Sequence, residues 1–195
     1  ESNAIKKVRE QIIRLASVDE DIFLIGETGT GKEVAANYYY IYSPRFDKPF
    51  HTVNCSALSE TLIESELFGH IKGSFTSADR DKTGFFEECS NGILFLDEVT
   101  NLSLMSQSKI LRAIENKEIQ VVGGNLKKVD TRLIFASNAG LEKLSDESIF
   151  RKDLFYRIEG NIVELPPLRE RDDDILLLIC YFLTSFSSQY RVIDR

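Results

Sequence analysis

The sequence has few of the residues that cross-link small secreted proteins or build metal centres. It contains three cysteines, two histidines and no tryptophan in 195 residues. An odd number of scattered cysteines does not make a disulfide framework, and the two histidines do not stand at a spacing used by metal sites. We therefore expect Cys55, Cys89, Cys180, His51 and His70 to be core or surface residues.

Long apolar runs are also missing. No run approaches the ~20 residues needed to cross a bilayer, and the N-terminal stretch has an amphipathic pattern without the apolar centre of a signal peptide. This predicts a cytoplasmic protein with no membrane contact. A formal charge of −7 argues against DNA binding by this segment, so any DNA contact is expected from a domain outside it. The chain begins at Glu1 without an initiator methionine, and we expect it to be a piece of a longer polypeptide.

What the sequence does contain is enough apolar residues, 43% of the chain, for one substantial core. Apolar runs predict five strands, at about 21–25, 50–54, 92–96, 132–137 and 161–165. Helical periodicity predicts helices at about 5–15, 32–42, 57–68 and 103–116, and a hairpin is expected at 119–129. This alternation predicts an α/β fold, with a parallel five-stranded sheet in a three-layer αβα sandwich.

The segment after the first predicted strand has the composition of a phosphate-binding loop. Its glycines allow a tight turn with inward-facing N–H groups, and its lysine can reach the outer phosphates of a nucleoside triphosphate. The candidate nucleotide-binding residues are Gly26, Glu27, Thr28, Gly29, Thr30, Gly31, Lys32 and Glu33. Glu33 stands where such loops usually have the Ser or Thr that binds Mg²⁺, so another residue must hold the metal.

Asp97 and Glu98 supply two carboxylates directly after another buried strand. Ligands gather at the carboxyl ends of parallel strands, which is where the phosphate loop also lies. Asp97 is therefore the candidate Mg²⁺ ligand, and Glu98 the candidate residue that polarises a water for attack on the γ-phosphate. Alone, the loop could simply join a strand to a helix, and the acidic pair could cap a helix. Together they favour hydrolysis of a nucleoside triphosphate, a reaction for which the resemblance described next supplies ATP as the substrate.

Three segments in order resemble the central AAA+ ATPase domain of sigma-54-dependent transcriptional activators, the NtrC-like bacterial enhancer-binding proteins. They read GETGTGKE at 26–33, ESELFGH at 64–70 and LPPLRER at 165–171. The resemblance covers nearly all of the chain and accounts for Glu33, because the family's loop ends in Gly-Lys-Glu. It implies a P-loop NTPase core of the AAA+ type over 1–171 and the start of a truncated helical lid over 172–195.

The resemblance also implies a partner loop in the segment at 69–83, which interrupts the alternation of strands and helices. The family's GAFTGA signature, which contacts sigma-54, here reads Gly73, Ser74, Phe75, Thr76, Ser77 and Ala78. Ser74 and Ser77 replace the family's small Ala and Gly. Two functions therefore remain open: an ATPase that remodels sigma-54 RNA polymerase for open-complex formation, or a nucleotide-responsive regulatory module that does not engage sigma-54.

Further catalytic residues follow from the same resemblance. Asn54 matches an asparagine that holds the glutamate, here Glu98, in a switchable hydrogen bond, and Asn138 matches a sensor of the γ-phosphate. Arg151 and Arg157 match arginines that reach a neighbouring subunit's nucleotide in a hexameric or heptameric ring. Without the resemblance, surface salt bridges worth under ~1 kcal/mol would be the expectation for them. A small-molecule kinase would share the phosphate loop but would need neither these arginines nor the partner loop.

Overall fold

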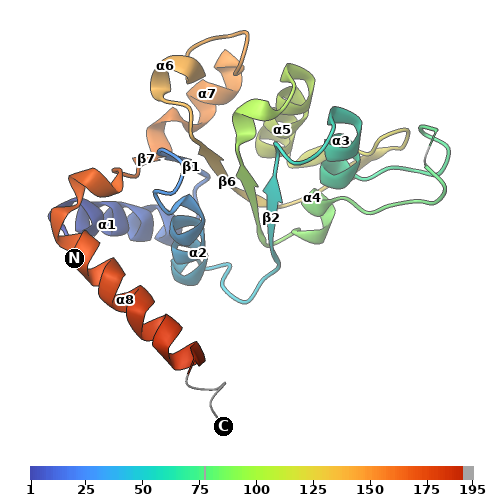
Figure 1. The fold of residues 1–195 in the computed structure, drawn as a ribbon. Coiled ribbons are helices and arrows are strands. Elements are labelled where there is room, and N and C mark those ends of the chain that lie inside the picture. Colours follow the sequence, from blue (N-terminus) through green and yellow to red (C-terminus); the bar gives the residue numbers. More distant parts are fainter. Residues whose placement is uncertain (77, 191–195) are drawn as a thin grey trace.

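A parallel five-stranded sheet forms the centre of the computed structural model, which describes residues 1–76 and 78–190 (Figure 1). Its strands, in sheet order, are β2 (Phe50–Asn54), β3 (Ile93–Asp97), β6 (Arg132–Ser137), β1 (Ile22–Ile25) and β7 (Ile162–Glu164). A separate antiparallel hairpin pairs β4 (Glu118–Gln120) with β5 (Leu126–Lys128). The predicted fold class is confirmed, and each strand lies within about one residue of its predicted range.

Helices cover both faces of the sheet. The longer ones are α1 (Asn3–Ser17), α2 (Lys32–Tyr42), α3 (Glu60–Phe68), α5 (Leu104–Asn116), α7 (Lys152–Ile158) and α8 (Asp172–Tyr190). The short ones are α4 (Phe85–Glu88), α6 (Leu141–Leu144) and the 3-10 turns η1 (Val99–Asn101), η2 (Glu159–Asn161) and η3 (Leu168–Glu170). The side chain of Ser2 caps α1 and that of Ser103 caps α5, because each accepts a hydrogen bond from a backbone N–H in the first turn.

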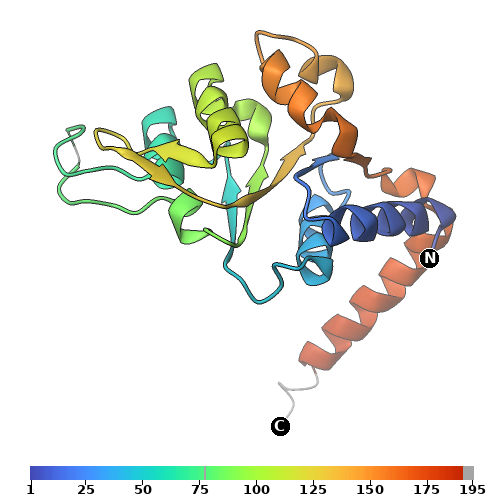
Figure 2. The ribbon, with the colours of Figure 1, turned by 180° about the vertical axis from the view of Figure 1, so that it is seen from behind.

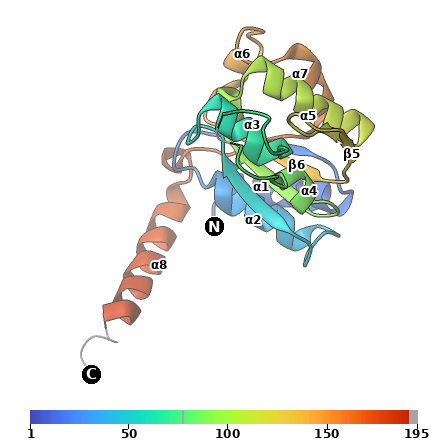
Figure 3. The same cartoon turned by 90° about the vertical axis from the view of Figure 1, so that its right-hand side faces the viewer.

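The sandwich arises because successive residues of each strand face opposite sides of the sheet. In β1, Phe23 packs in a core that contains residues of α3, α5 and α7, whereas Leu24 packs in a core with residues of α1 and α2. Figures 1 and 3 show α5 on one side of the sheet and α1 and α2 on the other. All four residues of β1 are buried, which explains why the strand reads as an unbroken apolar run.

A network of charged side chains closes the edge of the sheet where the strands begin. Asp19, in the left-handed region with φ 53°, pairs with Arg45 at 2.9 Å and with Arg132 at 3.1 Å. Arg132 also pairs with Asp21 at 3.2 Å, and Asp21 accepts the backbone N–H of Leu133 at 2.9 Å. These largely buried charges are therefore compensated by partners from three parts of the chain.

Helix α8 extends away from the sheet at the end of the described chain (Figures 1, 2 and 3). Its apolar side chains, among them Leu176 and Leu183, are exposed. Across the described residues, no helix is long and apolar enough to cross a membrane.

Candidate functional site

The loop at 26–31 joins β1 to α2 and has the backbone form that phosphate loops need. Gly29 and Gly31 have positive φ values of 84° and 95°, and a Cβ at Gly29 would meet no atom within 4 Å. Conformation, and not lack of space, therefore requires glycine at that position. Gly31 caps α2 without any side-chain hydrogen bond, so the first N–H groups of α2 remain able to bind an anion.

The side chain of Lys32 is folded back onto this loop. Its Nζ donates to the carbonyl of Gly26 at 2.9 Å and to that of Glu27 at 3.4 Å, and lies 4.0 Å from Oε1 of Glu98. The side chain is only 8% exposed, so these oxygens compensate a nearly buried ammonium group. Phosphate oxygens would be stronger partners for the same charge than the two carbonyls.

The acidic pair lies at the carboxyl end of β3, beside the end of β2. Oδ1 of Asp97 accepts the backbone N–H of Glu98 at 3.0 Å. Glu98 has φ 52°, a left-handed conformation that costs a residue with a side chain roughly 1 kcal/mol or more. Its Oε2 accepts the backbone N–H of Asn138 at 3.3 Å. The Glu98 carboxylate is therefore held near both the phosphate loop and the end of β6.

Asn54 has a different partner from the one that the sequence predicted. Its Oδ1 accepts the backbone N–H of Ser56 at 2.9 Å and the Ser56 hydroxyl at 2.7 Å. Within residues 1–76 and 78–190, no hydrogen bond joins Asn54 to Glu98. Since a backbone N–H only donates, the Asn54 atom facing Ser56 must be the oxygen, and the amide NH₂ remains available. Sequence reasoning missed Ser56, and an Asn two residues before a Ser in a turn was the available signal.

A cavity of about 580 Å³ brings these polar residues together. It is lined by Thr28, Asn54, Ser56, Asp97, Glu98, Thr100, Asn101, Asn138, Ala139, Lys143 and Ile149. Beside it, the Ser137 hydroxyl accepts the backbone N–H of Ala139 at 3.0 Å and lies 3.2 Å from the Thr100 hydroxyl. The ends of β2, β3 and β6 thus supply the predicted residues to one space next to the phosphate loop.

A second, mainly apolar pocket of about 610 Å³ lies on another side of the phosphate loop. Gly29, Thr30 and Gly31 line it together with apolar residues of α1, α2 and α8, and with Leu165 and Leu168. The loop therefore stands between an apolar pocket and a polar cavity. This arrangement suits a ligand with a flat, weakly polar group at one end and anionic groups at the other.

Arg151 and Arg157 belong to the region of α7 and are not among the residues that line the polar cavity. The guanidinium of Arg151 makes a two-pronged pair with Asp153, with Nε–Oδ1 3.0 Å and Nη2–Oδ2 2.6 Å. This hydrogen-bonded pair raises the pKa of Arg151 and lowers that of Asp153. The side chain of Arg157 is exposed on the last turn of α7.

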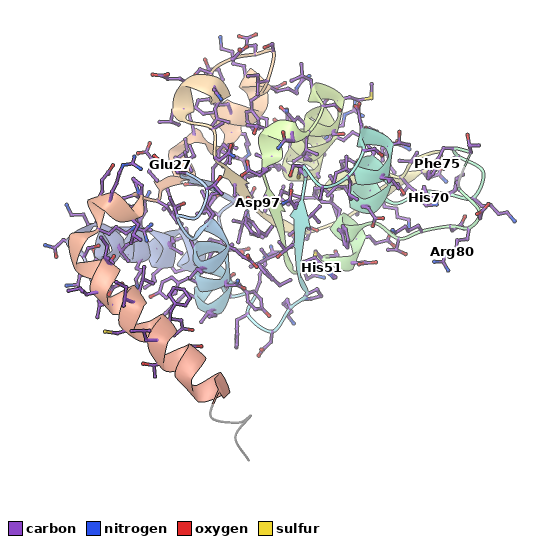
Figure 4. All side chains as sticks on the ribbon, in the orientation of Figure 1. Glu27, His51, His70, Phe75, Arg80 and Asp97 are labelled. Carbon is purple, nitrogen blue, oxygen red and sulfur yellow. The ribbon has the colours of Figure 1, made fainter. Side chains whose placement is uncertain are left out.

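The loop that carries Phe75 and Thr76 closes on itself at its base. His70 and Lys82 form an antiparallel bridge, with N–O distances of 3.0 and 2.8 Å. Below it, a Cβ on Gly84 would lie 2.2 Å from the nitrogen of Gly69, so the two backbones touch. Figure 4 shows Phe75, His70 and Arg80 on this loop, away from Glu27 and Asp97. Ser77, the fifth signature residue, lies outside the described residues.

The same loop lies beside the β4–β5 hairpin, as Figure 2 shows. The N–H of Ile71 donates to the carbonyl of Val122 at 3.1 Å, and the N–H of Val122 donates to Gly69 at 3.0 Å. A Cβ on Gly123 would lie 2.7 Å from Cβ of Ser74. The Ser74 hydroxyl is buried in this contact without a hydrogen-bond partner among the described residues. Loop and hairpin therefore form one packed unit.

A parallel sheet with this phosphate loop after one strand and an Asp–Glu pair after another defines a P-loop NTPase of the AAA+ type. The chain belongs to the family of the Sigma-54 interaction domain, whose model matches residues 1–164. It is 45% identical to the Psp operon transcriptional activator of Escherichia coli over 93% of this chain. It is 48% identical to the Nif-specific regulatory protein of Herbaspirillum seropedicae over 95% of this chain. It spans only 56% and 34% of these relatives' own lengths.

Among solved structures, NtrX from Brucella abortus is similar over 97% of this chain and 43% of its own, with a TM-score of 0.87 and 35% identity. A structure of NtrX in complex with ATP matches with the same TM-score over 96% of this chain and 41% of its own. Both the predicted family and the predicted fold are thus confirmed.

Proposed function

We propose that this chain is the ATP-hydrolysing domain of a transcriptional regulator that remodels sigma-54 RNA polymerase for open-complex formation. The observation that carries the proposal is the cavity beside the phosphate loop, where Asp97, Glu98 and Asn138 meet within a chain of the Sigma-54 interaction domain family. DNA contact belongs to another part of the longer protein, since this chain has a formal charge of −7.

ATP is the nucleotide we propose, bound with its phosphates on the loop and its base in the apolar pocket. The unsatisfied N–H groups at the start of α2 would bind phosphate oxygens. Lys32 would exchange the carbonyls of Gly26 and Glu27 for the outer phosphates. The ATP complex of NtrX, a similar structure, supports this choice of ligand.

Asp97 is the residue we propose to hold Mg²⁺. Among residues 1–76 and 78–190, no cluster of three or more Asp, Glu, His or Cys could form a complete metal cage. This fits Mg²⁺, which usually takes one or two carboxylates and completes its shell with waters and phosphates. Bound there, the ion would neutralise charge on the phosphates. Because Glu33 lies in the first turn of α2, it would sit beside the same phosphates without a hydroxyl to offer.

Glu98 is the residue we propose to accept a proton from the attacking water. Its Oε2 is held by the N–H of Asn138, which leaves Oε1 facing Lys32 at 4.0 Å. The side-chain amide of Asn138 would contact the γ-phosphate. The free NH₂ of Asn54 would donate to Glu98 in another nucleotide state, while its oxygen stays with Ser56.

Arg151 and Arg157 are proposed to act on the nucleotide of a neighbouring copy in a hexameric or heptameric ring. Neither lines the polar cavity of its own chain, and both lie by α7. An arginine supplied in trans is worth ~10³–10⁵ in rate where it stabilises transition-state charge. Arg151 would first have to leave Asp153. Their ion pair is exposed, so breaking it costs little free energy.

Phe75 and Thr76 are proposed to contact sigma-54. The test is binding of sigma-54 by the full-length protein with ADP and aluminium fluoride, measured by gel filtration beside its ATPase rate. A stable complex together with turnover is expected. Turnover with no complex, both in the natural protein and after the double change Ser74→Ala and Ser77→Gly, would overturn the remodelling function. Such a result would point to a regulatory module. Absence of turnover in the assembled protein would overturn the ATPase assignment.

A further inference from the structure

The segment at 166–174 crosses the phosphate loop on its way from β7 to α8, and Arg171 lies at its centre. The guanidinium of Arg171 donates from Nη2 to the carbonyl of Thr30 at 2.8 Å, and from Nε to the carbonyl of Pro166 at 2.7 Å. One planar group thus fixes the distance between the phosphate loop and the turn that follows β7. The fixed fork of a guanidinium makes such a two-point bridge possible.

The Thr30 carbonyl matters because of how a phosphate loop is built. A loop whose N–H groups face inward must turn carbonyls outward, and these need donors of their own. Lys32 donates to the carbonyls of Gly26 and Glu27 in this structure and would leave them when phosphates bind, although the Glu27 carbonyl keeps donors from Thr30 within the loop. The bond from Arg171 to Thr30 does not involve Lys32, so it remains to hold the loop.

A second arginine of the segment contacts the loop from outside. Arg169 makes a two-pronged pair with the Glu27 carboxylate at 2.8 and 2.6 Å. Both of these side chains are more than half exposed, so water and salt weaken the pair. Arg171 is less exposed, and burial lowers the pKa of its guanidinium. Of the two arginines, Arg171 therefore makes the firmer contact.

The far end of the segment is itself anchored. Asp174, only 7% exposed, accepts the backbone N–H of Ser2 at 2.6 Å and the Ser2 hydroxyl at 2.8 Å. The backbone N–H of Asp174 donates to the carbonyl of Arg171 at 2.7 Å. Ser2 is the residue that caps α1. The backbone of Arg171 is therefore tied through Asp174 to the start of α1, which makes its side chain a firm support.

We propose that Arg171 is a positioning residue for nucleotide binding: acting through the Thr30 carbonyl, it holds the phosphate loop in the conformation that accepts the phosphates, and the Asp174–Ser2 pair holds Arg171 in place. The inference rests on the proposed function, since it assigns a support to the same nucleotide site. It also means that α8, which begins within this segment, is coupled to the phosphate loop through Arg171.

One alternative is direct attraction between the Arg171 charge and the nucleotide, since Arg171 also lines the apolar pocket beside Gly29 and Gly31. Arg171→Lys separates the two roles. Lysine keeps the charge, but its single ammonium cannot reproduce the planar fork that reaches Thr30 and Pro166 together. In this variant the support of the phosphate loop is lost, whereas the attraction between the positive charge and the nucleotide is kept.

The experiment measures the Kd for ADP by calorimetry and the melting temperature without nucleotide, for the full-length protein and its Arg171→Lys, Arg171→Ala and Asp174→Asn variants. We expect about a 10-fold higher Kd in both Arg171 variants, because a charged hydrogen bond to the loop is lost. We expect a smaller rise in Asp174→Asn, and unchanged melting of Arg171→Lys. Arg112→Ala, which removes an exposed arginine of α5, is the matched control and should bind as the natural protein does.

The outcomes separate the inference from the function on which it rests. If the unaltered protein does not bind ADP, the proposed function fails and the inference with it. If it binds ADP and both Arg171 variants bind equally well, only the role of Arg171 fails. If Arg171→Lys has a normal Kd and Arg171→Ala has a raised Kd, then Arg171 acts by attracting the nucleotide with its charge and not by supporting the loop. A lowered melting temperature in Arg171→Lys with an unchanged Kd would mean that Arg171 stabilises the fold but does not position the loop for the nucleotide.

Discussion

The backbone N–H of Asn138 donates a hydrogen bond to Oε2 of Glu98 at 3.3 Å. The two residues directly follow β6 and β3, which are neighbours in the sheet, so the sheet itself aims the carboxylate. Because the donor is a backbone group, the side chain of Asn138 remains able to contact a ligand. The bond also accompanies the left-handed backbone of Glu98, an uncommon conformation that functional sites often retain.

The first prediction concerns this carboxylate. Glu98→Gln keeps the shape and the hydrogen-bond acceptor but cannot take a proton from water. We expect ATP binding to stay within a few-fold of the natural protein and turnover to fall by ~100-fold or more. Calorimetry and a phosphate-release assay measure the two quantities. Full turnover in the variant would remove Glu98 from the proposed role.

The second prediction separates binding from chemistry at Lys32. Lys32→Ala removes the ammonium that lies between the loop carbonyls and Glu98. Both ATP binding and turnover should be lost, because the outer phosphates lose their nearest positive charge. Nucleotide affinity near that of the natural protein would contradict the proposed ligand geometry. Circular dichroism before each titration verifies that the variant is folded.

The third prediction concerns the Ser74 hydroxyl, which is buried without a partner among residues 1–76 and 78–190. Ser74→Ala removes an unsatisfied polar group and should raise stability by about 1 kcal/mol, or a few degrees in melting temperature. Ser103→Ala provides the contrast. Ser103 accepts the N–H of Ser106 at 3.2 Å as the cap of α5, so the same chemical change there should lower stability by ~1 kcal/mol. A drop in both variants would show that the Ser74 hydroxyl is satisfied in solution.

The fourth prediction is a pH dependence at Asp19. Burial alone would raise the pKa of this carboxyl, but hydrogen bonds from Arg45 and Arg132 outweigh burial and leave the pKa below its ordinary value. A lowered pKa in the folded state means that the carboxylate stabilises the protein above about pH 4, and that this is lost as the pH falls through the folded-state pKa. Asp19→Asn should therefore cost ~2 kcal/mol at pH 7 and progressively less as the pH falls below about 4.

Urea unfolding at several pH values measures this difference, and Asp47→Asn is the matched control. Asp47 also has a positive φ, of 68°, but its side chain is exposed. Asparagine tolerates that backbone, so the control isolates the charge network. An equal loss of stability at pH 7 and pH 3 would contradict the prediction.

The fifth prediction concerns thiol reactivity. Burial raises the pKa of Cys55 and of Cys89 to about 12, and the carboxylates of Asp97 and Glu98 add to the effect at Cys55. Iodoacetamide at pH 8 should therefore leave both thiols unmodified and react with the exposed Cys180. Mass spectrometry should find one adduct on the native protein and three in urea. Labelling of Cys55 before unfolding would mean that the sheet edge opens.

Strands β1 and β3 were predictable because each is buried on both faces and reads as one apolar run. Helix α7 was not predicted, because its seven residues give only one buried pair at helical spacing, Leu154 and Ile158. The four-residue helices α4 and α6 are too short for any periodicity. The predicted start of α3 was three residues early, since the chain after Asn54 first forms a turn in which Ala57 donates to the Asn54 carbonyl.

The site was predictable where its residues lie at the carboxyl ends of strands in one parallel sheet, as Asn54, Asp97 and Asn138 do. The partner of Asn54 was not predicted, because the bond from Ser56 to its Oδ1 arises from the local turn, which the position of Asn54 at the end of a strand does not indicate. Arg171 was also missed as a support of the phosphate loop. It contacts Thr30 across 141 positions of sequence, and no spacing rule reports such a contact.

The contact between the backbones of Gly69 and Gly84 has a consequence for the length of the loop that they close. Because the bridge between His70 and Lys82 already brings the loop ends together, the residues that contact the hairpin, Ile71 and Ser74, are the more constrained part of the loop. Doubling a loop's length costs only about 0.6 kcal/mol in closure entropy. An insertion beside the exposed Asp79 and Arg80 would therefore cost little stability and would leave the sheet that carries the polar cavity unchanged.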